Sequence, residues 1–267
     1  MLGNTEDNVK ILKNLFENND FFKQQPSQHI NNLITNNNHI KIINSVRGLT
    51  NIKQRSFINT LISSYNDVNY MEIGSYYGAT LVSALLKNES VLNKIIINDH
   101  WSWGDADFDG FKSEVFDALK EFYNDRPNNF YFSNKYNTNK YNMSKLEGTM
   151  FDLTIVKGET FDSTQDILST WGNDKVDIYF YDGGHTWENQ RAALVEFREC
   201  FADEFIFIVD DFDTIEVRQG TAEGIRLLGV KSGYDVLYSV ETQDWNENRE
   251  DSNGWGGGLF VSYLKKR

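Results

Sequence analysis

Three aspartates follow two apolar runs of the sequence, and their spacing indicates that they meet in space. Asp182 ends the run VDIYFY, and Asp210 and Asp211 end the run FIFIV, 28 and 29 residues further along the chain. If the two runs are adjacent parallel strands, the three carboxylates share the carboxyl edge of a sheet, where open α/β folds bind ligands. Converging acids raise one another's pKa values unless a cation lies among them. An oxygen-only cluster of this kind suits Mg²⁺.

His185 follows Asp182 by three residues and therefore projects from the same loop. Histidine titrates near neutral pH, so this position predicts a general base beside the acids. Other interpretations stay open at this point. Acids at strand ends also cap helices or form polar turns, and a loop histidine is often a structural hydrogen-bonding group.

A glycine turn early in the chain has the pattern of a nucleotide site. The segment VNYMEIGSYYGATLVSALL, residues 68–86, indicates a strand, a turn and a helix, and Gly74 and Gly78 let the backbone approach a ligand. The Gly-x-x-x-Gly spacing differs from the Gly-x-Gly-x-x-Gly pyrophosphate fingerprint. Glu72 precedes the first glycine by two residues, and an acid there suits a ligand with a cationic amino group. The alternative is an ordinary tight turn.

A carboxylate at the end of the second apolar run is placed for a ribose. Asp99 lies 25 residues after the first glycine, where doubly wound folds carry an acid that accepts hydrogen bonds from both ribose hydroxyls. Alternatively, it is a solvated strand end or a helix N-cap. His100 and Trp101 follow directly and are placed to contact the same ligand. A second glycine turn carries Glu159 and Thr160, a suitable rim for an adenine ring.

These positions require a sheet, and the apolar runs predict one. Short runs that end in polar or glycine residues alternate with helical or loop segments, which indicates βαβ units and a parallel sheet. We expect five buried parallel strands, over residues 69–73, 95–98, 153–156, 176–181 and 205–209. Residues 234–240 and 258–264 lack an intervening helix, so they predict an antiparallel hairpin at one edge. The predicted fold is α/β, a Rossmann-like doubly wound sheet of seven strands.

Two further regions surround this sheet in the sequence. Residues 1–64 carry no strand-like run and predict an appendage of helices, broken around Pro26, in front of a domain formed by residues 65–267. Residues 108–123 predict an amphipathic helix. The polar segment 126–145 predicts an inserted loop near the active site. In the N-terminal helices and this loop we expect a lid, a specificity element or a dimer contact of a homo-oligomer.

Composition excludes several classes of partner. The 267 residues include 26 Lys and Arg against 39 Asp and Glu, so the net charge of −13 repels nucleic acids and anionic membranes. No apolar run approaches the roughly 18 residues of a membrane span. The single cysteine, Cys200, cannot form an internal disulfide, which fits a reducing, cytoplasmic setting.

Five segments together carry a family resemblance. In chain order they are MEIGSYYGAT, the acid Asp99, VKGETFD, VDIYFYDGGHTWENQRAALVEF and FIFIVDDFD. This set resembles class I S-adenosylmethionine-dependent methyltransferases, in the small-molecule O-methyltransferase branch with an Asp-Gly-x-His motif. It is also similar to the metal-dependent catechol-type and macrolide-sugar O-methyltransferases. The resemblance runs from about residue 65 to the C-terminus.

The resemblance implies roles for the candidate residues. It implies that the methionine part of the cofactor is held by four residues of the glycine turn: Glu72, Gly74, Ser75 and Gly78. Asp99 would hold the ribose, Glu159 and Thr160 the adenine, and Asp182 would contact both cofactor and metal. The metal, Mg²⁺, would be bound by Asp182, Asp210 and Asp211, and it would lower the pKa of the acceptor hydroxyl. Catechol-type relatives carry a lysine base where this chain has His185.

The leading hypothesis is therefore an enzyme that moves the methyl group of S-adenosylmethionine to a hydroxyl of a small molecule, such as a sugar. One alternative is a metal-independent N-methyltransferase of an amino sugar, in which the aspartates contact the amine directly. Another is a module that binds S-adenosylmethionine without catalysis. A dinucleotide-dependent oxidoreductase is disfavoured by the glycine spacing.

Overall fold

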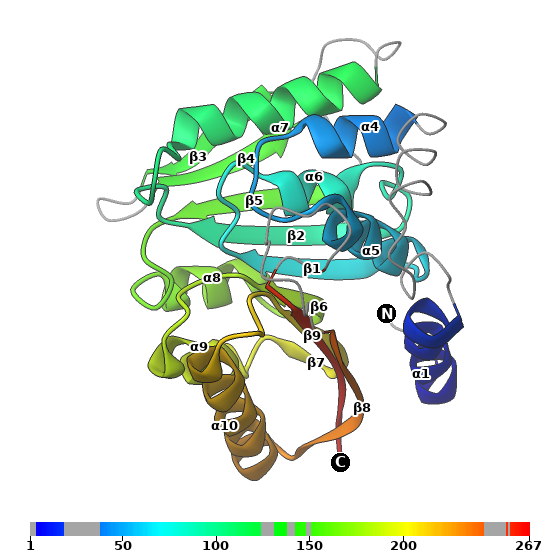
Figure 1. Ribbon diagram of the computed structural model, residues 1–267. Coiled ribbons are helices and arrows are strands. Elements are labelled where there is room, and N and C mark those ends of the chain that lie inside the picture. Colours follow the sequence, from blue (N-terminus) through cyan, green and yellow to red (C-terminus); the bar gives the residue numbers. More distant parts are fainter. Residues whose placement is uncertain are drawn as a thin grey trace.

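A nine-stranded sheet forms the centre of the chain, and helices cover both of its faces (Figure 1). The computed structural model describes residues 4–18, 38–123, 131–137, 142–147, 151–242, 255 and 257–267. In sheet order the strands are β3 (Tyr131–Asn137), β4 (Asn142–Glu147), β5 (Asp152–Lys157), β2 (Leu92–Asp99), β1 (Val68–Ile73), β6 (Val176–Tyr181), β7 (Phe201–Val209), β9 (Leu259–Lys266) and β8 (Tyr234–Thr242).

The helices fall into two groups, one on each face. The first group is α1 (Thr5–Lys13), α4 (Asn38–Ser45), α5 (Ile52–Ser63), α6 (Ala79–Leu85) and α7 (Phe108–Phe122), with a π-helical turn at Asn14–Asn18. The second group is α8 (Thr164–Trp171), α9 (Trp187–Val195) and α10 (Ile215–Ser232). Side chains alternate between the two cores: Tyr70 packs with the first group, and the next residue, Met71, packs with the second.

The strand pairing confirms the predicted doubly wound architecture. Strands β5, β2, β1, β6 and β7 are parallel, and β9 and β8 add the antiparallel pair at one edge. From β1 the chain proceeds through β2 to β5 on one side, and then crosses back to β6 and β7 on the other. The strand order therefore reverses between β1 and β6, which is the place where such sheets bind ligands.

The predicted loop at residues 126–145 is wrong where the structure describes it. Two strands, β3 and β4, form an antiparallel pair there, and β4 pairs with β5, so the sheet has nine strands instead of seven. Residues 126–130 and 138–141 lie outside the described residues. The polar sequence has no alternation of apolar residues, but the open backbone groups at the edge of β5 can pair with a strand of any composition.

The N-terminal helices α4 and α5 belong to the same hydrophobic core as the sheet. Phe57 and Leu61 of α5 are fully buried together with Leu81 of α6. Pro26, where we expected a break between helices, lies outside the described residues.

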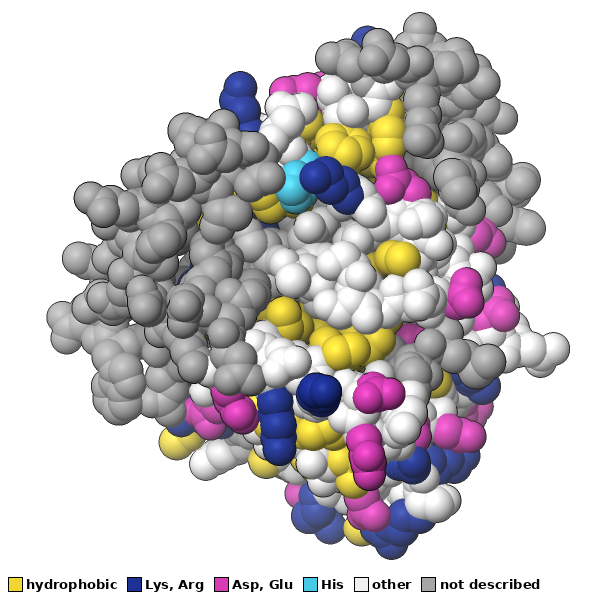
Figure 2. Space-filling view, turned by 90° about the vertical axis from the view of Figure 1, so that its right-hand side faces the viewer, with side chains coloured by type: hydrophobic (Ala, Val, Ile, Leu, Met, Phe, Trp, Pro, Cys, Tyr) yellow, Lys and Arg dark blue, Asp and Glu magenta, His cyan; other side chains and the backbone are white. Residues whose placement is uncertain are grey.

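None of the described helices is long and apolar enough to cross a membrane. On the face drawn in Figure 2, Lys and Arg side chains are interspersed with Asp and Glu.

A buried arginine fixes the connection between α4 and α5. Arg55 is 4% exposed, and its guanidinium donates hydrogen bonds to the carbonyl oxygens of Ile43, Val46, Gly48 and Thr50, at 2.8 to 3.2 Å. Burial lowers the pKa of Arg55 to about 10, so the group keeps its charge at neutral pH. The α4–α5 connection is therefore held in one conformation by a single side chain.

We expect Arg55→Leu to lower the free energy of unfolding by about 3 kcal/mol or more, because four carbonyl groups, three of them in buried hydrogen bonds, lose their donor. Urea denaturation measures this difference. The matched control is Arg226→Leu, which removes an exposed arginine that pairs only with Glu223 among the interactions described for it, and it should have little effect. Equal losses in the two variants would contradict the role given to Arg55.

Candidate active site

A cavity of about 600 Å³ opens at the carboxyl edge of the sheet, where the strand order reverses. Most residues that the sequence predicted for binding or catalysis line it: Gly74, Ser75, Asp99, His100, Trp101, Glu159, Thr160, Asp182, His185, Asp210 and Asp211. Two predicted residues, Glu72 and Gly78, are absent from the described lining. The loops that follow five parallel strands therefore meet around one space.

Gly74 is required by the close approach of the loops after β1 and β6. Its φ is +87°, and a Cβ atom at this position would lie 1.9 Å from the carbonyl oxygen of Asp182. Gly78 has a φ of +88°, and its Cβ would lie 2.6 Å from a methyl group of Val115 on α7. The two glycines thus set the path of the loop between them, and Ser75 and Tyr76 of that loop line the cavity.

Glu72 lies behind this loop and holds it from inside. The side chain has no exposed surface; its Oε1 accepts hydrogen bonds from Ser75 (2.7 Å) and Thr80 (2.8 Å), and its Oε2 accepts one from Tyr70 (2.8 Å). Burial raises the pKa of Glu72 to about 7, and the charge of Asp99 adds to the shift. Glu72 therefore positions the loop from behind, while Ser75 and Thr80, which donate to it, line the cavity.

Asp99 joins two loops while it faces the cavity. Its Oδ2 accepts the backbone N–H of Tyr76 and its Oδ1 that of Trp101, both at 2.8 Å. Tyr76 and Trp101 have φ values of +47° and +48°, a conformation that non-glycine residues keep only where surrounding contacts hold it. Each carboxylate oxygen has two lone pairs, so Asp99 can still accept hydrogen bonds from a ligand.

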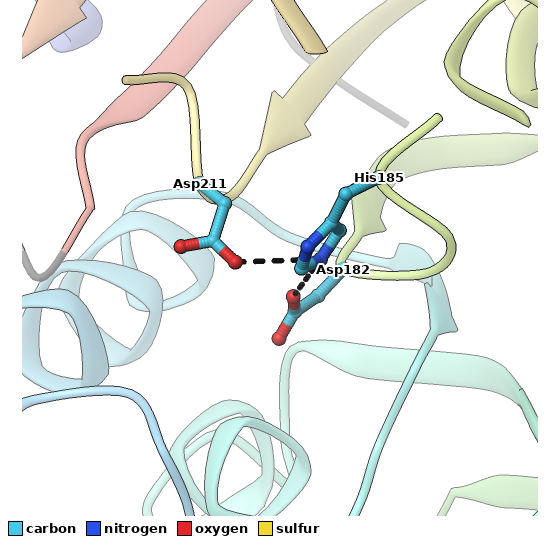
Figure 3. Close-up of side chains that lie close together, drawn as sticks. All are labelled: Asp182, His185 and Asp211. Carbon is cyan, nitrogen blue, oxygen red and sulfur yellow. Dashed lines mark ion pairs between the residues drawn. The ribbon is translucent and has the colours of Figure 1, made fainter. Parts of the chain in front are cut away.

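Asp182, His185 and Asp211 form a compact group at the other side of the cavity (Figure 3). His185 Nε2 lies 3.3 Å from Asp211 Oδ2 and 3.7 Å from Asp182 Oδ1. The histidine is half exposed, and the two carboxylates are mostly covered. Burial raises the pKa of Asp182 well above its usual range, and the nearby charges of Asp211, Glu72 and Asp99 add to this effect.

Asp210 is oriented differently from the other two predicted metal ligands. Its Oδ1 accepts a 2.6 Å hydrogen bond from Gln54 Nε2 on α5 and a 2.9 Å hydrogen bond from the backbone N–H of Asp211. The Asp210 residue is only 6% exposed, and burial raises the pKa of its carboxyl group well above its usual range. The structure therefore groups Asp182 and Asp211 with His185, and it pairs Asp210 with Gln54.

The donor atoms of Asp182, His185 and Asp211 form a group that could hold a divalent cation. One ligand atom from each lies within 4.8 Å of the others. Adjacent ligands around Mg²⁺ are about 3 Å apart, since its bonds to oxygen are about 2.1 Å long. Carboxylate oxygens suit Mg²⁺ and Mn²⁺, whereas an imidazole suits later transition metals better. In this set the two carboxylates are thus the natural ligands of Mg²⁺, and the imidazole remains able to carry a proton.

Some of the lining was not predicted from the sequence. Gly48, Leu49 and Thr50, in the connection between α4 and α5, form part of the cavity wall, and so does Asn189 of α9. Gln54 was also missed. These residues carry no motif, and only the packing of α5 against α6 and the sheet brings residues 48–54 to the site. No local pattern in the sequence could have indicated them.

A family comparison agrees with this arrangement. The model of the family Methyltransf_24, described as a methyltransferase domain, matches residues 71–212, just over half of the chain. The chain belongs to this methyltransferase-domain family. The match covers all five parallel strands except for the beginning of β1, and it ends directly after Asp211. It confirms the recognition of a methyltransferase from the five sequence segments.

Solved structures confirm the fold of this methyltransferase. The O-methyltransferase from Bacillus cereus in complex with SAH is 12% identical, with a TM-score of 0.55 over 89% of this chain and 97% of that chain. Cofactor-bound Rv0187 from MTB is 12% identical, with a TM-score of 0.50 over the full length of both chains. At this level of identity the likeness concerns the fold alone. No curated protein matches the sequence.

The buried Glu72 predicts a pH dependence of stability. Its folded-state pKa of about 7 exceeds the ordinary 4.5, so the folded protein binds more protons than the unfolded chain between these values. The free energy of unfolding therefore falls as the pH rises through this window. In Glu72→Gln, whose amide oxygen can accept from Ser75 and Thr80 while its NH2 donates to the Tyr70 hydroxyl, we expect this fall to be smaller by about 3 kcal/mol.

Urea denaturation at pH 5 and pH 8 measures this difference. Asp182 and Asp210 shift in the same direction in both proteins, so the difference reports Glu72 together with the part of the Asp182 shift that the charge of Glu72 causes. Glu199→Gln, an exchange at an exposed position, serves as the control and should leave the pH dependence unchanged. A parallel pH dependence in wild type and Glu72→Gln would show that Glu72 is ionised throughout the window.

Proposed function

We propose that this methyltransferase binds S-adenosylmethionine and transfers its methyl group to a hydroxyl of a small molecule, such as a sugar, with assistance from Mg²⁺. The observation that carries the proposal is the shared cavity: Asp99 lies on one side of it, and Asp182, His185 and Asp211 lie on the other. The group that accepts hydrogen bonds from the ribose hydroxyls and the group that accepts the substrate proton thus face the same cavity.

The proposed cofactor position follows the strand ends. Asp99 accepts the ribose hydroxyls, and the methionine part lies along the loop of Gly74 and Ser75. Glu159 and Thr160 bound the adenine, with Phe161 beside them as an apolar surface. The sulfonium is cationic, and the carboxylates around the cavity favour it electrostatically. The solved B. cereus enzyme, which shares this fold, is an O-methyltransferase in complex with SAH.

The proposed reaction is an in-line displacement. The acceptor oxygen forms a bond to the methyl carbon while the bond from that carbon to sulfur breaks, and the electron pair leaves with the sulfur as a thioether. The hydroxyl proton passes to the imidazole of His185, and the carboxylates of Asp182 and Asp211 beside Nε2 stabilise the resulting cation. When bound by these two carboxylates, Mg²⁺ supplies Lewis acidity that lowers the pKa of the acceptor hydroxyl.

The cofactor part is tested by calorimetric titration with SAH. We expect Asp99→Asn to weaken binding by about tenfold or more, because the amide loses charge-assisted hydrogen bonds to the ribose and to the two loops. The control is Asp174→Asn, an exposed position at the opposite edge of the sheet, which should leave the dissociation constant unchanged. Wild-type protein that does not bind SAH would refute the cofactor assignment.

The reaction is tested with labelled S-adenosylmethionine and a panel of sugars, phenols and amines. We expect transfer to hydroxyl compounds, loss of transfer on addition of excess chelator, and recovery on addition of Mg²⁺. Full activity in excess chelator would refute the metal part. Transfer to amines alone would instead assign a metal-independent N-methyltransferase, and SAH binding without any transfer would assign a binding module.

A further inference from the structure

We infer that Gln54 is a positioning residue of the site: through Asp210 it holds Asp211 in the conformation that places the Asp211 carboxylate beside His185. The catalytic consequence of this inference rests on the proposed function, whereas the arrangement of the three side chains can be tested independently. Gln54 lies in α5, outside the segment that the methyltransferase family covers.

The first link is the contact between Gln54 and Asp210. Gln54 Nε2 donates to Asp210 Oδ1 at 2.6 Å, and the two residues are 1% and 6% exposed. A hydrogen bond from an amide to a carboxylate is charge-assisted, and exclusion of water strengthens it. The contact connects positions that are 156 residues apart, so it ties α5 to the end of β7.

The second link runs from Asp210 to Asp211. The same Oδ1 of Asp210 accepts the backbone N–H of Asp211 at 2.9 Å, so the carboxylate contacts the first peptide group after its own residue. The chain turns at Asp211, which has a φ of +52°, in the left-handed region that aspartate tolerates better than most residues. Gly257 makes room on the other side, because a Cβ atom there would lie 2.3 Å from Asp211 Oδ1. This turn directs Asp211 Oδ2 toward His185 Nε2, 3.3 Å away.

The amide of Gln54 is fixed in one orientation by the start of α5. Its Oε1 accepts the backbone N–H of Asn51 at 3.1 Å, while the side chain of Asn51 accepts the N–H groups of Lys53 and Gln54, which completes a capping box. With Oε1 engaged in the cap, Nε2 is the atom that faces Asp210. The start of α5 is thereby connected to Asp210 at the wall of the cavity.

This arrangement changes the role of Asp210. The Oδ1 of Asp210 already accepts two hydrogen bonds, and the side chain points to α5 instead of joining Asp182, His185 and Asp211. Asp210 therefore acts on the reaction through Asp211, as a support for its backbone. The sequence pattern DD does not reveal this division between a supporting and a reacting carboxylate.

The decisive variant is Gln54→Glu. A glutamate can keep the bond to the Asn51 N–H, but it places a carboxylate against Asp210 and removes the donor. We expect kcat to fall by about a hundredfold, as for a reacting group displaced by about 1 Å, while KM for S-adenosylmethionine stays within about twofold. The matched control is Ser63→Ala, an exposed exchange at the other end of α5 that leaves Gln54 and its cap intact, and its kcat should stay close to wild type.

The conservative variant Asp210→Asn separates support from direct participation in the reaction. The amide introduced at position 210 keeps an Oδ1 that can accept both the Gln54 Nε2–H and the Asp211 N–H, while its Nδ2 replaces Oδ2 and the charge is lost. We expect this variant to retain most of the wild-type kcat, because both hydrogen bonds of the support persist. If Asp210→Asn is as slow as Gln54→Glu, the Asp210 carboxylate acts directly in the reaction and the inference is overturned.

A measurement on the ligand-free protein separates this inference from the proposed function. The chain has four histidines, so the imidazole ¹⁵N signals of His185 can be assigned by their loss in His185→Gln. We expect these signals to shift in Gln54→Glu and to stay in place in the control Ser63→Ala. Unchanged His185 signals in folded Gln54→Glu would overturn the inference even if the protein transfers methyl groups. Shifted signals would uphold the positioning even if no transfer is found.

Discussion

The close contact between the ends of β1 and β6 is the constraint on which the rest of the site depends. Gly74 lies against the carbonyl group of Asp182 at a distance that excludes any side chain, and the Asp182 N–H donates to the carbonyl of Ile73 at 2.8 Å. This contact brings the loop of Ser75 and Tyr76 next to the loop of Asp182 and places both at the reversal of the strand order. The cavity exists because the loops on either side must diverge from this point.

The carboxylates around the cavity divide into those that hold neighbouring loops and those that lie beside His185. Glu72 and Asp99 accept hydrogen bonds from the glycine loop and its neighbour, and Asp210 accepts them from α5 and from the chain after β7. Asp182 and Asp211 are left to face the ligand space with a histidine between them. Because so many acids are covered from water together, burial raises the pKa values of Glu72, Asp182 and Asp210. A bound cation would offset this repulsion, which is the physical reason why we propose a sulfonium and a metal at this place.

Local patterns predicted much of this arrangement, and long-range packing determined the remainder. The five parallel strands and the positions of Gly74 and Asp99 follow from runs and spacings within the chain, so the sequence indicated them correctly. The burial of Glu72 could not be foreseen, since it depends on hydroxyl groups from three different positions that converge in the fold. Strands β3 and β4 were missed because an edge pairing uses backbone groups and leaves little trace in composition. The contact of Gln54 with Asp210 joins two positions that are 156 residues apart, and no motif links them.

The position of α5 bears on how such a protein acquires its specificity. The family match starts at residue 71, whereas part of the cavity wall and the partner of Asp210 come from residues 48–54. Arg55 holds the α4–α5 connection, which forms this part of the wall, through four carbonyl groups, and the adjacent Gln54 donates to Asp210. Two neighbouring residues in the first turn of α5 therefore fix both the wall and the Asp210 side chain. A fold with a common cofactor site can change its acceptor by changing segments outside the shared core. Here that segment is also hydrogen-bonded to Asp210, so a change in the wall is coupled to the conformation of the chain after β7.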